Sequence, residues 1–397
     1  MLAYRRSDFE ALARSLEVRR WADGGFVDGP AGELLARKFP SPFYSPNPFI
    51  RIGLFLFGYI CGGAALGLLF LMSGMGGSSG SIGTLLFIYA AGALGLQEIW
   101  ARKPKPFFRA GVEEAMTYSG LAAAIAAVLI LSRFHGDVHA GLALALAAVF
   151  ALAAMRYADS LLALASMAAV FFALFDVGGR YGERALFLLP PAAIAISVCI
   201  VIAASWALRQ ASMAPWEHVW KLLRFAGLLT AYAGGNYFVV REAGSAMLHA
   251  SVTEGSDIAL APLFYAYTFA MPLVYLAYGL MRKDRQFLDA GLAIFAAAVF
   301  TYKRYHNVMS VEMGLTLAGF ALIAVAWAAL KGFKASKPAR FGICSAPVPR
   351  ATGAGLMNAE SLALWNTFAP KDAAAQGPEG IQGGGGKFGG GGAEGSF

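Results

Sequence analysis

The sequence predicts an all-α fold, a polytopic integral membrane helical bundle with about ten transmembrane helices. Two observations predict it. Hydrophobic residues make up 58% of the 397 positions and charged residues only 14%, a composition that excludes ordinary soluble globular proteins. Apolar stretches close to the roughly 20 residues that one span needs recur between residues 50 and 330.

The expected spans follow one another with short polar loops between them. They cover residues 50–72, 82–101, 115–132, 139–155, 161–177, 186–207, 223–240, 259–281, 286–302 and 308–330. The fourth, fifth and ninth are near the minimum of about 17 residues. A chain of this kind requires the lipid bilayer as its partner.

The orientation follows from the Lys and Arg residues of the short loops, which resist translocation. The loops after the second, fourth, sixth and eighth spans hold eleven of them and the opposite loops hold six. Both termini are therefore expected in the cytoplasm. The net charge of +8 fits this topology and attraction to anionic lipid headgroups, and we expect no nucleic-acid partner.

Residues 1–49 are expected to form a cytoplasmic helical hairpin and a linker. Ser7 and Glu10 have capping-box spacing, and the apolar residues that follow fall on one helix face. Asp28 and Pro30 can start a second short helix, and the Pro-rich stretch 40–48 is a semi-rigid linker into the transmembrane core at 50–330.

Residues 331–397 are expected to form a cytoplasmic tail. The stretch "NAESLALWNTF" (358–368) has the pattern of one amphipathic helix, and the Gly-rich end buries too little apolar surface to fold. A flexible tail is the simpler interpretation, and a protein partner for the Gly-rich segment is the alternative.

A polar stretch before the last expected span contains Arg304, His306 and Glu312. The structural interpretation is an ion pair between Arg304 and Glu312 that closes a helical hairpin at the outer surface. The functional interpretation is a proton-handling pair of His306 and Glu312, because a carboxylate tunes the charge of a neighbouring histidine near neutral pH.

The seventh expected span contains Gly234, Gly235, Asn236 and Tyr237. This sequence can break the helix, and transporters bind solutes at such breaks because freed backbone groups line a cavity. Glycine also occurs in membrane helices simply because it permits close packing, so a tight helix contact is the alternative.

Two outer histidines, His135 and His139, lie four residues apart with Asp137 between them. On a helix they would share a face that suits zinc. Gly136 favours a solvated turn instead, and the sequence contains no recognised catalytic motif. We therefore expect no cofactor.

Three stretches together resemble a known family. They are the hairpin with Trp21, Gly25 and Phe26, the late segment with Arg304, Tyr305, His306, Asn307, Glu312 and Gly319, and the Gly-rich tail. This combination is similar to a family of uncharacterised bacterial polytopic membrane proteins that carry a domain of unknown function, with a tail like that of Bacteroidetes-type members. The resemblance implies location in the bacterial inner membrane and supplies no activity.

The sequence favours a non-enzymatic function, either transport of a small solute or a scaffold of the cell envelope. The alternative is a membrane-embedded, metal-dependent enzyme with an outer-facing site of histidine and glutamate side chains.

Overall fold

The computed structural model describes residues 2–23, 27, 29–74, 78–133, 139–181, 185–248 and 260–305, together with the single positions 313, 316, 319, 320, 323 and 327. Within these ranges the chain is all-α, as predicted, and its only β-type pairing is one isolated bridge between Tyr44 and Phe107.

Two helices precede the transmembrane region, where the hairpin was expected. They are α1 (Arg6–Asp23) and α2 (Gly29–Lys38), and they pack against each other. The extended segment that follows ends at Asn47, whose side chain accepts a hydrogen bond from the Ile50 amide and so caps the next helix.

Seven helices are long and apolar enough to cross a membrane. They are α3 (Pro48–Ser73), α4 (Ser79–Ala101), α5 (Val112–Leu131), α6 (Ala140–Tyr157), α7 (Ser160–Gly179), α8 (Ala185–Ala207) and α11 (Ala261–Arg282). Within α8 the candidate span covers Phe187–Ala207. They correspond to the first six expected spans and to the eighth.

The three other expected spans are not among these seven helices. The seventh is interrupted, because α9 (Glu217–Gly235) ends one residue before Asn236 and α10 (Tyr237–Leu248) begins one residue after it. The ninth corresponds to α12 (Arg285–Tyr305), which carries charged residues at both ends. The tenth is described only at the six single positions after 305, each of which is helical. The count of ten thus stays a prediction.

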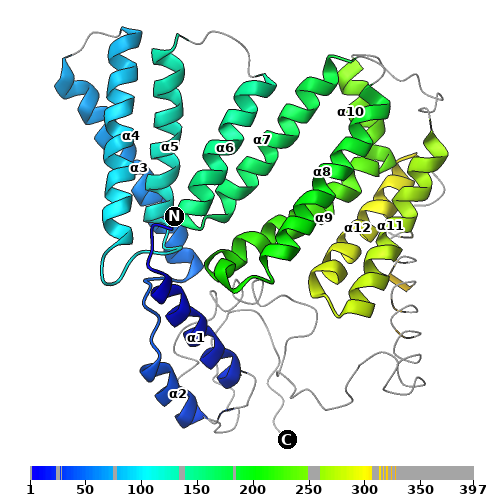
Figure 1. The fold of residues 1–397 in the computed structure, drawn as a ribbon, viewed down its shortest axis with the longest axis horizontal. Coiled ribbons are helices and arrows are strands. Elements are labelled where there is room, and N and C mark those ends of the chain that lie inside the picture. The colour runs from blue at the N-terminus through cyan, green and yellow to red at the C-terminus, as the bar shows by residue number, and fades with distance from the viewer. Residues whose placement is uncertain are drawn as a thin grey trace, which may run out of the picture.

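From α3 to α9, consecutive long helices run in alternating directions (Figure 1). α3 and α4 pack on α5, α6 packs on α7, α8 on α9, and α11 on α12. We call one end of the bundle the basal end. It holds α1, α2, the loop 102–111, the α6–α7 turn at 158–159 and the 3-10 helix η2 (Ala211–Trp216) that precedes α9.

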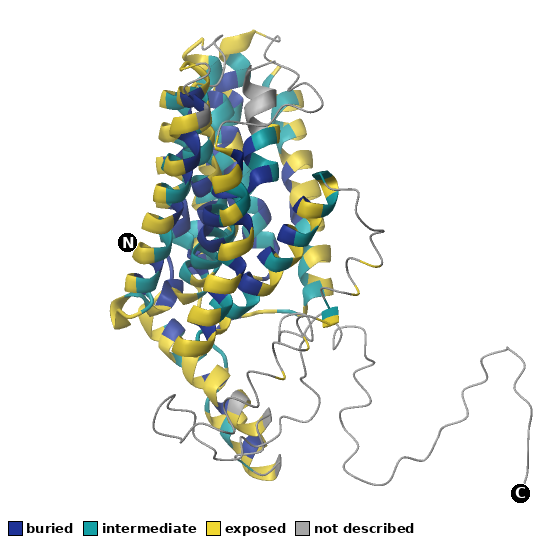
Figure 2. Cartoon of the chain, turned by 90° about the vertical axis from the view of Figure 1, so that its right-hand side faces the viewer, coloured by how far each residue is buried: buried dark blue, intermediate teal, exposed yellow. Residues whose placement is uncertain are grey.

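The bundle is apolar on its outside and packed by small residues inside. Large side chains such as Leu71, Leu152 and Met281 are 82%, 72% and 71% exposed, and Figure 2 shows exposed positions along the outer faces of the helices. The buried positions of α5 and α6 are mostly alanine and glycine. Apolar surface directed outward and small residues between helices are typical of a membrane helical protein.

Candidate functional site

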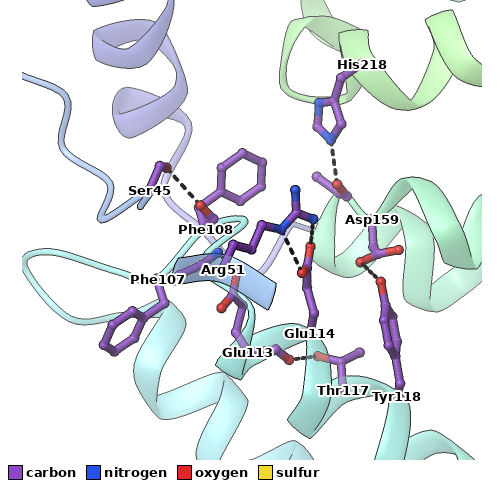
Figure 3. A network of polar contacts seen from close by, with 12 residues as sticks. Ser45, Arg51, Phe107, Phe108, Glu113, Glu114, Thr117, Tyr118, Asp159 and His218 are labelled. Atoms are coloured by element: carbon purple, nitrogen blue, oxygen red, sulfur yellow. Dashed lines mark hydrogen bonds and ion pairs between the residues drawn. The ribbon is translucent and has the colours of Figure 1, made fainter. Parts of the chain in front are cut away.

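Polar and ionisable side chains gather around a pocket at the basal end of the bundle. The pocket has a volume of about 270 Å³, and we call it the basal pocket. It lies where three groups of helices meet, namely α3 to α5, the α6–α7 pair, and the start of α9. Its lining residues are Tyr4, Arg51, Gln97, Phe108, Arg109, Glu113, Glu114, Thr117, Tyr118, Tyr157, Ala158, Asp159, Ser160, Leu161, His218 and Leu222. Figure 3 shows much of this polar network.

The N-terminal segment forms one wall of the basal pocket. The Ala3 amide donates a hydrogen bond to the Arg156 carbonyl oxygen at 2.8 Å, which anchors this segment beside the end of α6. The Tyr4 hydroxyl donates to the Phe107 carbonyl oxygen at 3.1 Å. Burial, reinforced by the nearby Glu113 carboxylate, holds the pKa of Tyr4 far above its ordinary value, so the phenol stays neutral.

The loop 102–111 carries the chain into α5 and sets the position of Glu113. Its Phe108 amide and Pro106 carbonyl oxygen bond to the backbone of Tyr44. Gly111 has a φ of +105°, and a Cβ at this position would collide with the Arg51 carbonyl oxygen on α3. Only glycine permits this approach, which presses the start of α5 against α3.

Two adjacent glutamates begin α5 and have different surroundings. Glu114 forms an ion pair with Arg51, whose Nε donates to Glu114 Oε2 at 3.0 Å while its Nη2 contacts Oε1. Glu113 Oε1 accepts a hydrogen bond from the Ala110 amide at 2.6 Å, and Glu113 Oε2 is buried without a hydrogen-bond partner. Glu113 is only 4% exposed, so its carboxylate is buried beside the pocket with one oxygen unused.

Gln97 on α4 also has an unused oxygen. This side chain is 1% exposed, and its Nε2 donates to the Tyr4 hydroxyl at 3.4 Å. Its Oε1 has no hydrogen-bond partner. Buried polar atoms are nearly always paired in folded proteins, so an atom on a pocket lining that the protein does not pair is available to hydrogen-bond a ligand or water.

The α6–α7 turn and the start of α9 complete the pocket. Asp159 caps α7 through the Leu162 amide at 2.9 Å and accepts a hydrogen bond from the Tyr118 hydroxyl at 2.8 Å. His218 Nε2 lies 2.7 Å from the Ala158 carbonyl oxygen, to which it donates. Burial lowers the pKa of His218 below its ordinary value, and the Arg109 charge adds to this, so its neutral form is favoured.

The lining of the pocket offers both charged groups and hydrogen-bonding groups to a small polar molecule. Three carboxylates and two guanidinium groups line the pocket, and one guanidinium is already used in the ion pair with Glu114. In the described part of the chain no three His, Cys, Asp or Glu side chains converge as a metal site would require.

The break predicted in the seventh span is present at Asn236, where a buried polar cluster holds it. Asn236 Nδ2 donates to the Tyr232 hydroxyl at 2.9 Å and lies 3.1 Å from Thr301 Oγ1 on α12. Its Oδ1 accepts from the Val239 amide, and the Tyr237 amide donates to Thr268 on α11. Gly234 packs against α8 and Gly235 against the Tyr267 ring, which agrees with the close-packing alternative. The expected cavity at this break stays a prediction.

The other candidate residues lie apart from the basal pocket or outside the described residues. Arg304 is in the last turn of α12, whereas His306 and Glu312 are not described, so their pairing stays untested. His139 occupies the N-cap position of α6 and is exposed, while His135 and Asp137 are not described. The zinc hypothesis therefore also stays a prediction.

The sequence pattern alone does not single out Glu113 or Glu114 as site residues. It did not single out Gln97 or Asp159. A signal was present, because a glutamine one turn before a span ends and a Glu-Glu pair at the start of the next span face the same membrane boundary. Their convergence with residues 4, 51 and 218 depends on tertiary packing.

In comparison with known proteins, the chain matches no family model, no curated protein and no solved structure. The family resemblance therefore stays a prediction, and the site is defined by its own geometry.

Proposed function

We propose that this chain is a membrane transport protein for a small polar solute and that the basal pocket binds this solute. The observation that carries the proposal is the pair of buried, unpartnered oxygens, Gln97 Oε1 and Glu113 Oε2, on side chains that line one pocket. Ionisable groups that are buried within membrane helices and face the bundle interior are characteristic of solute pathways, and Glu113 in the first turn of α5 is buried in this way.

The position of the pocket supports transport. It lies between groups of helices that pack mainly within themselves, and alternating access works by movement of one such group against another around a fixed site. A rearrangement between α5 and the α6–α7 pair would change access to Glu113 and Asp159 together, since these residues lie on opposite sides of the pocket.

The proposed topology has ten spans in the bacterial inner membrane, with both termini in the cytoplasm. The basal end supports this orientation, because it combines the N-terminal helices with the loops that hold the larger share of Lys and Arg. The basal pocket would then face the cytoplasm. A protein partner for the tail at 331–397 would be compatible with transport.

The test is solute flux into liposomes that contain the purified full-length protein. Ammonium, methylammonium, potassium, acetate, phosphate and glycerol are offered in parallel, and uptake is compared with that of empty liposomes. We expect uptake of at least one of these solutes, lost in the Glu113→Gln and Gln97→Leu variants. Glu217→Gln is the matched control, because Glu217 is an exposed basal glutamate paired with Lys221.

Wild-type liposomes that take up none of these solutes faster than empty ones would contradict the proposal. So would uptake that is equal in the wild type and in correctly folded Glu113→Gln and Gln97→Leu variants.

A further inference from the structure

We infer that the solute bound in the basal pocket is a small cation with N–H donors, either ammonium or a small primary amine. This inference rests on the proposed function and names its substrate class. It starts from the chemistry of the two unused atoms: Gln97 Oε1 and Glu113 Oε2 both accept hydrogen bonds, and neither is satisfied by the protein. When Glu113 is ionised, as at the pH 8 of the binding experiment below, a ligand that completes this site must donate.

The charge of the pocket favours a cation over a neutral donor. Glu114 is neutralised by Arg51, and Asp159 accepts hydrogen bonds from the Tyr118 hydroxyl and the Leu162 amide. Glu113 has a backbone amide on one oxygen and forms no ion pair among the described residues. When Glu113 is ionised, its buried negative charge is therefore the one that a bound cation would compensate.

The same groups disfavour an anion. The Arg51 guanidinium is engaged by both oxygens of Glu114, so it is not free to hold a second carboxylate or a phosphate. The other pocket arginine, Arg109, is exposed, where water and salt screen its charge. Burying a second anion beside Glu113 would add repulsion in a poorly hydrated site.

An N–H donor also fits better than an alkali ion. Gln97 and Glu113 are 1% and 4% exposed, so a cation that reaches their oxygens must shed most of its water. Two free oxygens accept from two of the three N–H donors of methylammonium and leave the third for water, whereas they provide few ligands for a bare metal ion. Tyr4, Phe108 and Tyr118 add aromatic surface to the lining, which attracts alkylammonium groups by cation–π contact.

The pocket has room for a short-chain amine. A volume of about 270 Å³ holds methylammonium or ethanolamine with accompanying water. The polar and aromatic side chains of the lining together suit a charged amino group on a short carbon chain.

Binding is tested by isothermal titration calorimetry on the purified full-length protein in detergent at pH 8. Methylammonium chloride is compared with tetramethylammonium chloride, which has the same charge and no N–H donor, and with potassium chloride and sodium acetate. We expect methylammonium to bind at least tenfold more tightly than the three others. Equal or tighter binding of tetramethylammonium, potassium or acetate would overturn the inference.

Variants locate the site within the pocket. Glu113→Gln and Gln97→Leu are expected to weaken methylammonium binding at least tenfold, while Glu217→Gln leaves it unchanged. Unchanged binding in the first two variants would overturn the assignment. If either variant fails to fold, as judged by gel filtration, the ranking of the four salts on the wild-type protein still decides the ligand class.

The binding experiment tests the ligand class and the flux experiment tests transport, so one proposal can be contradicted while the other stands. Selective methylammonium binding without any flux would contradict transport and leave the ligand class standing. Flux of glycerol, acetate or phosphate without methylammonium binding would contradict the ligand class and leave transport standing.

Discussion

The basal pocket and the Asn236 cluster are both polar regions inside an apolar bundle, and they differ in how their polar atoms are satisfied. At Asn236 the side-chain amide and carbonyl are bonded to Tyr232, Thr301 and the Val239 amide. In the basal pocket Gln97 and Glu113 each keep one buried oxygen unpaired. The first pattern is that of a helix break that the protein itself stabilises, and the second is that of a site that a ligand completes.

The largest expected effect comes from Gly111, which sets the geometry of the basal pocket. Gly111→Ala places a Cβ against the Arg51 carbonyl oxygen at a φ of +105°. We expect a loss of about 3 kcal/mol or more in stability and loss of ligand binding, because α5 can no longer approach α3. Thermal unfolding in detergent measures the stability. Gly53→Ala is the control on α3, since nothing lies within 4 Å of an added Cβ there, and equal melting of the two variants would contradict the prediction.

Asn236→Leu removes the side chain that holds the helix break. The Tyr232 and Thr301 hydroxyls each lose a partner in the buried core, with a cost of about 2 kcal/mol or more. We expect a lower melting temperature with unchanged methylammonium affinity at a temperature where the variant is folded. Normal stability with lost affinity would instead make the Asn236 cluster the solute site.

The two adjacent glutamates are expected to respond with opposite signs. Glu114→Gln leaves the half-buried Arg51 without its ion partner and should cost about 2 kcal/mol. Glu113→Gln removes a buried, unpaired charge and should leave stability unchanged or raise it, while it abolishes ligand binding. Melting temperatures of the two variants, measured side by side, test this contrast. A larger loss of stability in Glu113→Gln than in Glu114→Gln would show that the Glu113 carboxylate stabilises the fold.

The smallest expected effect is a pH dependence of stability at His218. Burial, aided by Arg109 and opposed by the Ala158 carbonyl, Asp159 and Glu217, lowers the pKa of His218 from its ordinary value of 6.5. The unfolded chain therefore binds this proton more readily than the folded chain, and stability falls as pH drops below about 6.5. One unit of pKa difference corresponds to about 1.4 kcal/mol.

Melting temperatures between pH 8 and pH 5 check this for the wild type and His218→Gln, whose amide can still donate to the Ala158 carbonyl oxygen. The variant should lose stability less steeply below pH 6.5. Identical slopes in the two proteins would contradict a lowered pKa at this residue.

The sequence determines the long apolar helices and the helix break but not the basal pocket. α3 to α8 and α11 could be predicted because length and apolar composition suffice for a span. The break at Asn236 could be predicted from its two preceding glycines. α9 and α12 fall short of the same criterion because charged residues lie within them, such as Arg224 and Asp289.

The pocket could not be predicted because its parts come from distant positions. Tyr4, Arg51, Gln97, Glu113, Asp159 and His218 meet only through the packing of six separate segments. The sequence pattern does not predict that Arg51 pairs with Glu114 rather than with Glu113. This pairing leaves the Glu113 carboxylate available for a ligand.

The most direct test compares methylammonium uptake into liposomes that contain the wild type, Glu113→Gln or Asn236→Leu, each normalised to the amount of folded protein. The basal pocket as the solute site predicts uptake by the wild type and by Asn236→Leu, and none by Glu113→Gln. Uptake by Glu113→Gln at the wild-type rate, with none by Asn236→Leu, would contradict it and place the solute at the helix break.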